Sequence, residues 1–149
     1  MLSLENVMKS SIGEYLRGAH CSEVIFKDVT KAWNHNFDES LVRVATPFGG
    51  GIAERGDACG ALVGALMVIG YLFGRSSLYE SQSFCLELSR KFYDGFKNQF
   101  SATTCYGIRG HIFTWETHVE CAETVRQSIN LLWELLNYAQ ETGQLEWQR

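Results

Sequence analysis

The chain has 149 residues, of which 46% are hydrophobic and 20% are charged, and this composition excludes disordered and fibrous proteins. Its net charge of −4 comes from 13 Lys and Arg scattered among 17 Asp and Glu. That pattern argues against nucleic acid or an anionic membrane surface as the main partner. The length fits one domain, residues 1–149.

The start of the chain and its most apolar stretch bear on where the protein resides. The first residues, Met-Leu-Ser-Leu-Glu-Asn, show no basic region followed by a long apolar run, so we expect no secretory signal peptide. The stretch from Ala61 to Phe73 is about 13 residues long, whereas a membrane-spanning helix needs roughly 20. We therefore expect a buried helix there, in a cytoplasmic protein that is not inserted in a membrane.

Helical periodicity dominates the first third of the chain. Apolar residues at helical spacing predict a first helix over about residues 4–16 and a second over about 22–33. Asp38 is expected to cap a short third helix that Pro47, the only proline, brings to an end. The side chains predicted to pack inward from it are Leu41, Val42, Val44 and Ala45.

The rest of the chain predicts three longer helices. A loop at residues 49–51 precedes the central apolar helix, for which Asp57 is the expected cap, and another helix follows over about 78–100. Thr117 and Glu120 have the spacing of a capping box before a last helix. Its apolar positions are Ala122, Val125, Ile129, Leu132, Trp133 and Leu136. No segment alternates as a strand would, so we predict an all-α, single-domain bundle of five to six helices.

Four of the five cysteines fall at or beside predicted helix beginnings. They are Cys21, Cys59, Cys105 and Cys121. Helix N-termini present free N–H groups and partial positive charge, which favour the thiolate, the form that attacks electrophiles and binds metals. In a reducing compartment such cysteines indicate redox chemistry or metal binding. Cys85 lies within a predicted helix among apolar residues, and we expect it to be a core side chain.

Glycines surround Cys59. Those at 49–51 allow unusual backbone angles, and Gly60 and Gly64 leave one side of the central helix nearly bare. Either tight helix packing or room for a cofactor would offset the cost of glycine in a helix. The candidate cofactor-binding glycines are Gly49, Gly50, Gly51, Gly60 and Gly64. No Lys-Ser/Thr follows the glycines and no strand precedes them, so neither nucleotide-binding pattern is met.

Two histidines and one arginine lie near the cysteines in sequence. His20 adjoins Cys21, and His118 precedes Cys121 by three residues, so either imidazole is a candidate to tune a thiol or to bind a metal. The plain alternative is an exposed histidine. Arg55 would stabilise a thiolate if it pointed inward.

Taken together, the cysteine and glycine motifs match a known pattern. Cys21-Ser22 opening a helix, Phe48-Gly49-Gly50-Gly51, Cys59-Gly60-Ala61-x-x-Gly64 and two single downstream cysteines resemble a bacterial and archaeal family of redox-active proteins. The family is named for its C…GCAxxG…C…C pattern, and the resemblance covers about residues 15–138. Its four motif cysteines map onto Cys21, Cys59, Cys105 and Cys121, whereas Cys85 lies outside the pattern.

The resemblance implies an all-α fold and a redox or cluster-binding role. The chain is also similar to the cysteine-bearing helical domain of split-Soret cytochromes, which implies an iron–sulfur cluster as cofactor. Because the chain has no Cys-x-x-Cys-His, covalently attached c-type haem is not expected.

Several functions therefore stay open. The leading hypothesis is electron transfer or redox sensing by the four cysteines as ligands of an iron–sulfur cluster. The alternatives are a metal-free thiol–disulfide protein and a structural zinc protein, although zinc sites usually space their cysteines more closely. A further alternative is a helical interaction module that docks on a membrane transporter or a larger oxidoreductase. A homodimer fits the apolar central helix, while no enzyme activity and no particular redox partner is assigned.

Overall fold

The structure, a computed structural model, describes residues 2–145. Its elements are α1 (Leu4–Tyr15), α2 (Cys21–Trp33), the 3-10 helix η1 (Glu39–Phe48), α3 (Gly60–Phe73), α4 (Ser83–Phe100), α5 (Cys105–Arg109), α6 (Trp115–Glu120) and α7 (Ala122–Glu141). Within residues 2–145 there is no strand, only one isolated bridge between Ala58 and Thr104. The all-α, single-domain class is confirmed, but the described part of the chain has seven α-helices where five to six were predicted.

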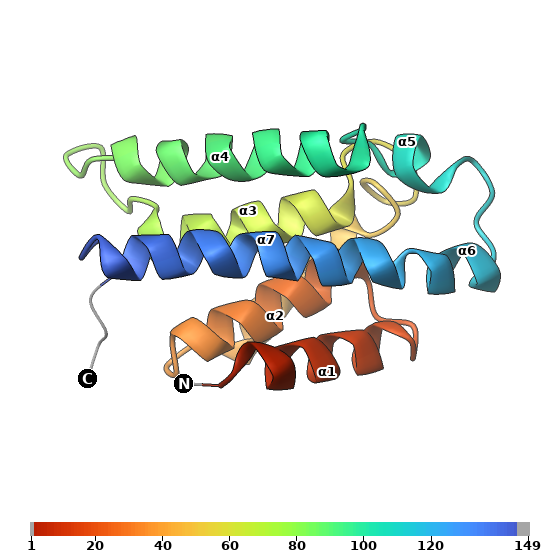
Figure 1. Cartoon of the computed structure of the whole chain (residues 1–149), viewed down its shortest axis with the longest axis horizontal. Coiled ribbons are helices and arrows are strands. Elements are labelled where there is room, and N and C mark those ends of the chain that lie inside the picture. The colour runs from red at the N-terminus through yellow and green to blue at the C-terminus, as the bar shows by residue number, and fades with distance from the viewer. Residues whose placement is uncertain (1, 146–149) are drawn as a thin grey trace.

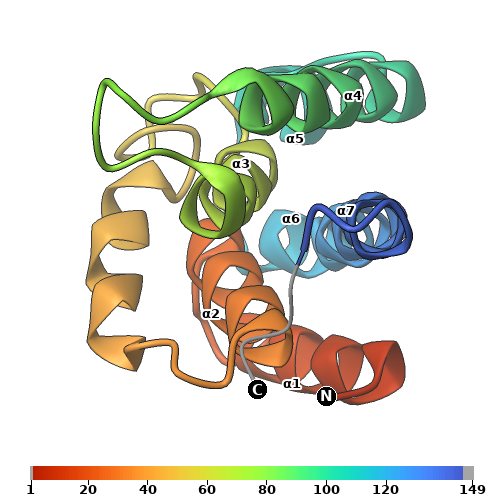
Figure 2. The same ribbon diagram turned by 90° about the vertical axis from the view of Figure 1, so that its left-hand side faces the viewer.

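The helices pack in layers around α3 and α7. Figure 1 shows α4 along one side of this pair and α1 and α2 along the other. α2 and α3 pack closely, and α7 contacts α1, α3 and α4. Figure 2 shows η1 on the outside of the bundle, next to α2 and α3. The short helices α5 and α6 lie at the same end of the bundle (Figure 1).

The predicted apolar stripes form the core. On α7, Val125, Ile129, Leu132 and Leu136 are fully buried, one helical turn apart. The central helix α3 is apolar on nearly every side and lies between neighbouring helices, as the sequence predicted. Among residues 2–145, no helix combines the length and apolarity needed to cross a membrane.

The segment after Asp38 differs from its prediction in type and in packing. Asp38 does cap it, since its carboxylate accepts from the Ser40 N–H at 2.9 Å, but the helix is 3-10 and contains Pro47. In a 3-10 helix residues three apart share a face. The inward stripe is therefore Val42, Ala45 and Phe48, while the predicted core residues Leu41 and Val44 are exposed.

Two predicted helix beginnings are also wrong. Cys59, not Asp57, caps α3, because Asp57 is held in the preceding loop: its N–H donates to the Gly51 carbonyl and its own carbonyl accepts from the Cys105 N–H. α4 begins at Ser83 instead of residue 78. Ser77 accepts from the Tyr79 N–H at 3.2 Å, a local hydrogen bond that favours a turn over a helix.

The capping box near the last helix lies one turn earlier than predicted. Thr114 caps α6, and its partner is Thr117: Thr114 Oγ1 accepts from the Thr117 N–H, and Thr117 Oγ1 accepts from the Thr114 N–H. α7 then follows directly after Cys121.

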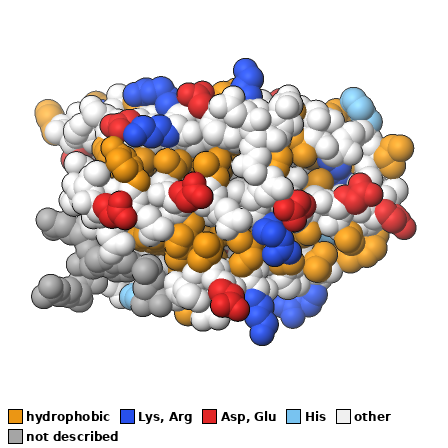
Figure 3. Space-filling view, viewed as in Figure 1, with side chains coloured by type: hydrophobic (Ala, Val, Ile, Leu, Met, Phe, Trp, Pro, Cys, Tyr) orange, Lys and Arg blue, Asp and Glu red, His pale blue; other side chains and the backbone are white. Residues whose placement is uncertain are grey.

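On the face in Figure 3, acidic and basic side chains are interspersed, with hydrophobic side chains between them. An open groove lined by Leu4, Met8, Ile12 and Arg126 has a volume of about 680 Å³ between α1 and α7. The homodimer and the docking partner that the sequence suggested stay predictions.

Candidate functional site

Four cysteines stand at the beginnings of four different helices. Cys21 is the first residue of α2 and Cys105 the first of α5, while Cys59 caps α3 and Cys121 caps α7. The predicted placement at helix starts is therefore confirmed. Thr104 caps α5, since its hydroxyl accepts from the Gly107 N–H at 3.0 Å. The predicted cap at Thr103-Thr104 thus lies at the second threonine.

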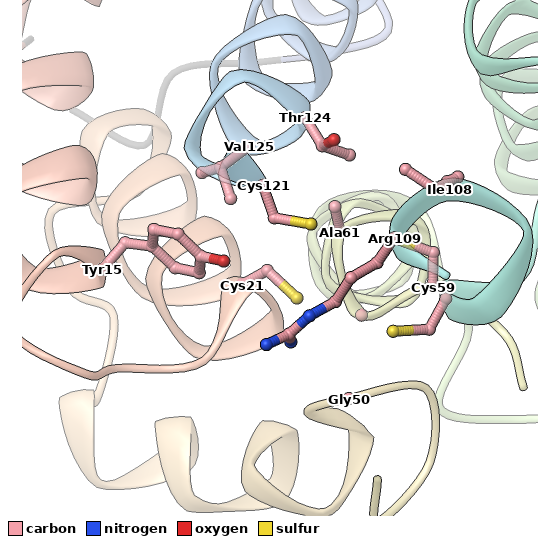
Figure 4. A pocket seen from close by; sticks show the side chains of 12 residues that line it. Tyr15, Cys21, Gly50, Cys59, Ala61, Ile108, Arg109, Cys121, Thr124 and Val125 are labelled. Atoms are coloured by element: carbon pink, nitrogen blue, oxygen red, sulfur yellow. The ribbon is translucent and has the colours of Figure 1, made fainter. Parts of the chain in front are cut away.

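These four helix starts converge on one small, partly open cavity with a volume of about 30 Å³ (Figure 4). All four cysteines line it, together with Tyr15, Gly50, Gly60, Ala61, Ile108, Arg109, Thr124 and Val125. Cys59 and Cys105 are 6% and 8% exposed, and Cys21 and Cys121 are half-buried. Cys85 does not line the cavity; it lies half-buried against the core, close to its predicted role.

Main-chain hydrogen bonds hold two of the cysteine segments together. The Cys59 N–H donates to the Thr103 carbonyl at 2.9 Å, and the Cys105 N–H donates to the Asp57 carbonyl at 2.7 Å. These bonds flank the bridge between Ala58 and Thr104. The loop before α3 and the loop before α5 are thus fixed to one another, which places Cys59 and Cys105 on the same cavity.

Glycine in α3 lets α2 approach closely. A Cβ on Gly60 would stand 2.5 Å from Cys21 Sγ and 2.9 Å from the Phe48 carbonyl oxygen, so only glycine leaves Cys21 its place. A Cβ on Gly64 would stand 2.9 Å from the Ser22 Cα and carbonyl oxygen. Gly60 lines the cavity, whereas Gly64 serves the packing of α3 on α2.

The three consecutive glycines have three different neighbours. A Cβ on Gly49 would collide with the His20 ring, and one on Gly51 would stand 2.6 Å from Cys105 Cβ. Gly50 lines the cavity. Of the five predicted glycines, Gly50 and Gly60 therefore reach the cavity, and the other three allow close approach of the surrounding chain.

A left-handed turn begins at Gly50 and extends beyond the glycines, whose freedom to adopt unusual backbone angles was the one sequence signal for it. Five consecutive residues have positive φ: Gly50 (66°), Gly51 (73°), Ile52 (62°), Ala53 (49°) and Glu54 (62°). For a non-glycine residue this conformation costs about 1–2 kcal/mol. The turn is closed by a hydrogen bond from the Ala53 N–H to the Pro47 carbonyl at 2.7 Å. It presents Gly50 to the cavity, and strained backbone of this kind clusters at functional sites.

Among the described residues that line the cavity, Arg109 alone carries a positive charge, and sequence reasoning missed it. Figure 4 shows its side chain extending from α5 into the cavity. Nε donates to Thr117 Oγ1 at 3.1 Å, Nη2 donates to the Thr114 carbonyl at 3.2 Å, and the guanidinium lies 4.3 Å from the Phe113 ring centre. The spacing of four residues from Cys105 on a predicted helical turn could have identified it. Arg55, the arginine considered from sequence, is exposed and does not line the cavity.

Burial reverses the expected effect of the helix starts on the thiols. Burial raises the pKa of Cys59 to about 11, although the Ala61 and Leu62 N–H groups lower it. Burial also raises the pKa of Cys21 well above its ordinary value, and the negative charges of nearby thiolates add to the increase. The expectation that these sites favour thiolates is therefore wrong for the metal-free protein, because desolvation outweighs the helix N-terminus.

The remaining two cavity thiols follow the same rule. Burial raises the pKa of Cys105 and of Cys121, and the Arg109 guanidinium lowers both in part. At neutral pH the four cysteines are consequently neutral thiols.

Tyr15 closes the side of the cavity next to α1, and His118 holds it there. The Tyr15 hydroxyl donates to the His118 carbonyl at 2.8 Å. Burial, and then the charge of a Cys21 thiolate, raise the pKa of that hydroxyl. His118, a candidate ligand from sequence, does not line the cavity and lies behind Tyr15. His20 also lies outside the cavity.

A comparison with known protein families shows to which family the chain belongs. The family model described as "Putative redox-active protein (C_GCAxxG_C_C)" matches residues 19–135. The chain belongs to this family. The resemblance found in the sequence is thereby confirmed, and the match spans all four cavity cysteines. No curated protein and no solved structure matched the chain.

Because the chain belongs to a family described as redox-active, we ask whether the cavity already forms a metal site. Within residues 2–145 no group of three His, Cys, Asp or Glu side chains has an arrangement that could hold a metal ion. The four cysteines of the family pattern thus line one cavity, and within the described residues they do not form a finished metal site.

Proposed function

We propose that this member of the redox-active family transfers electrons through an iron–sulfur cluster held by Cys21, Cys59, Cys105 and Cys121. The observation that carries the proposal is that these four cysteines line one small cavity from four separate helix starts. Four cysteine thiolates are the commonest ligand set of such clusters.

The chemistry of the donors fits the cluster. Four neutral thiols crowd a cavity in which each thiolate would raise the pKa of its neighbours. A bound cation reverses that balance, because metal ligation releases the thiol protons and compensates the sulfur charges. Such a cluster, when bound, accepts and releases single electrons.

The size of the cavity sets a condition on loading. A volume of about 30 Å³ accommodates one or two water molecules, so the sulfur atoms and the Arg109 side chain must rearrange when a cluster enters. Two hydrogen bonds, to Thr117 Oγ1 and to the Thr114 carbonyl, hold the half-buried Arg109 side chain, so its movement requires these bonds to break or this segment to move with it. The apolar wall of Tyr15, Ile108 and Val125 then limits the access of water.

A metal-free thiol–disulfide protein is the second candidate. Exchange with an external disulfide requires an accessible thiolate of low pKa. Here burial raises the pKa of all four thiols and limits access to them, which favours metal ligation over exchange with a partner protein. A disulfide formed inside the cavity is the form of this alternative that the burial leaves open.

Anaerobic reconstitution tests the proposal. The purified protein is incubated with ferrous iron and sulfide, desalted, and analysed for iron, sulfide, zinc and visible charge-transfer absorption. We expect iron and sulfide in stoichiometric amounts. We also expect Cys21→Ser, Cys59→Ser, Cys105→Ser and Cys121→Ser each to lose most of the bound iron, and Cys85→Ser, the matched control outside the cavity, to retain it.

The same samples separate the alternatives. Wild-type protein that binds no iron and sulfide contradicts the proposal, as do serine variants that all load like the control. Mass spectrometry after mild oxidation then identifies a defined disulfide if the metal-free alternative holds. Tolerance of all four substitutions would instead favour an interaction module.

A further inference from the structure

A second hollow opens beside the cysteine cavity. It is a cleft of about 340 Å³, which lies within the range of small-molecule sites. Gly50 and Arg109 line both the cleft and the cavity, so the two hollows share a wall. The other side chains that define the cleft are His20, Glu54, Phe113, Trp115 and His118.

Arg109 brings an unmatched positive charge to this wall. Its two hydrogen bonds, to Thr117 Oγ1 and to the Thr114 carbonyl, use two of the five N–H donors of a guanidinium. In the part of the chain that the structure describes, no carboxylate forms an ion pair with it. An arginine with spare donors is well suited to a carboxylate, which it binds through two parallel hydrogen bonds.

Aromatic side chains form another part of the cleft. Trp115 is 55% exposed and Phe113 is 37% exposed, although both are large apolar side chains. The Trp115 and His118 rings lie nearly parallel, with their centres 5.1 Å apart. His118 thus covers one face of the Trp115 indole, and the exposed part of the indole gives the cleft that Arg109 also lines a flat apolar surface. Such a surface suits a ligand that also has a flat apolar body.

Glu54 limits the charge that the cleft accepts. It comes from the left-handed turn and is the one acidic side chain among the described residues that line the cleft. Its negative charge opposes polyanions such as phosphates, whereas a single carboxylate directed at Arg109 avoids most of that repulsion.

We propose that this cleft binds a small organic monoanion with a planar apolar body, its carboxylate on Arg109 and its ring against Trp115. The cleft is present in the metal-free protein, and testing it does not require the cofactor of the neighbouring cavity. It places its ligand across a shared wall from the four cysteines, within the same end of the bundle.

Four probes dissect the site in the metal-free, reduced protein: benzoate, benzamide, acetate and inorganic phosphate. Isothermal titration calorimetry measures their affinities, and the fluorescence change that the wild type shows and Trp115→Ala lacks is assigned to Trp115, one of four tryptophans. We expect benzoate to bind. Acetate lacks the ring, benzamide lacks the negative charge, and phosphate is a polyanion. Each of these three should therefore bind roughly tenfold more weakly than benzoate or not measurably.

Two cleft variants and one control complete the test. Arg109→Gln should weaken benzoate roughly tenfold and leave benzamide unchanged, and Trp115→Ala should weaken both aromatic probes. Arg126→Gln, on the surface of α7, should bind benzoate like the wild type. Circular dichroism establishes that each variant is folded.

The proposal is overturned if benzoate does not bind, if benzoate and benzamide bind equally, or if phosphate binds more tightly than benzoate. It is also overturned if folded Arg109→Gln keeps the wild-type affinity. None of these outcomes depends on iron or sulfide, so a failure here is distinguishable from a failure of the proposed electron-transfer function.

Discussion

The Tyr15 and His118 rings stack with their centres 4.0 Å apart, and each residue hydrogen-bonds the main chain of the other. The Tyr15 hydroxyl donates to the His118 carbonyl, and His118 Nε2 donates to the Tyr15 carbonyl at 2.7 Å. The pair joins the end of α1 to α6 and thereby fixes one wall of the cysteine cavity.

Tyr15→Phe should lower the free energy of unfolding by about 1 kcal/mol, because it removes one donor from this reciprocal pair while keeping the ring. Urea unfolding followed by circular dichroism measures the change. Tyr79→Phe is the matched control, since Tyr79 is 100% exposed and should shift stability by less than about 0.5 kcal/mol. Equal stability of the two variants would contradict the role of the hydroxyl.

Two glycines of α3 should respond to alanine with opposite signs. Gly60→Ala places a methyl group 2.5 Å from Cys21 Sγ and should lower the free energy of unfolding by about 1–3 kcal/mol. Gly70→Ala meets nothing within 4 Å and should raise it by about 0.5–1 kcal/mol through helix propensity. Thermal and urea unfolding of both variants check the signs. Stabilisation by both would mean that α2 does not approach α3 this closely.

The left-handed turn should accept glycine. Ala53→Gly relieves a positive φ of 49° at an exposed position and should raise the free energy of unfolding by up to about 1 kcal/mol. Ala65→Gly, in the buried interior of α3, should instead lower it by about 1 kcal/mol. Urea unfolding curves distinguish the two. A loss of stability in Ala53→Gly would show that the turn has ordinary right-handed geometry in solution.

Asp28 should make stability depend on pH. Burial raises the pKa of its carboxyl above the ordinary 3.8, although the Ser11 hydroxyl donates to it at 2.8 Å and opposes the increase. The folded protein therefore holds this proton more tightly than the unfolded chain, and the contribution of Asp28 to stability falls as pH rises from about 3.8 through the raised pKa.

The stability of Asp28→Asn relative to the wild type should accordingly increase with pH across that window. Urea unfolding at a series of pH values from 4 to 7 measures the difference. Asp38→Asn is the control: hydrogen bonds from the Ser40 hydroxyl and N–H lower the pKa of the exposed Asp38 carboxyl, so its pH-dependent contribution is lost only below about pH 3.8. The difference between Asp38→Asn and the wild type should therefore stay nearly constant from pH 4 to 7. A difference between Asp28→Asn and the wild type that does not vary with pH would contradict the burial of an ionisable carboxyl there.

The sequence predicted those parts of the fold that depend on the spacing of apolar residues and on local helix caps. The stripes of α1, α2 and α7 were correct because apolar residues recur at 3.6-residue spacing and are buried together. η1 was misassigned because its buried stripe repeats every three residues, a period that a short segment does not distinguish from the α-helical one. Leu78 and Tyr79, apolar but exposed in a loop, extended the predicted helix too far.

In the candidate site, too, the features set by local sequence were predictable and those set by tertiary packing were not. The placement of Cys21, Cys59, Cys105 and Cys121 at helix starts follows from local signals, and their meeting in one cavity agrees with the pattern of the family. Their raised pKa values were not predictable, since the desolvation that causes them depends on tertiary packing.

The left-handed turn could be predicted from the sequence only in part, for a different reason. Gly50 and Gly51 permit positive φ, but Ile52, Ala53 and Glu54 do not ordinarily adopt it. Their conformation is imposed by hydrogen bonds to residues 47–49, which only the folded chain supplies.

The four cavity cysteines stand at the beginnings of α2, α3, α5 and α7. A group bound to all four sulfurs would therefore crosslink segments spread over most of the chain. Detachment of any one of these helices would then remove a ligand, so release of the group and cooperative unfolding would become a single event. Loading the cavity should slow amide exchange along the whole bundle, far beyond the residues that touch the bound group.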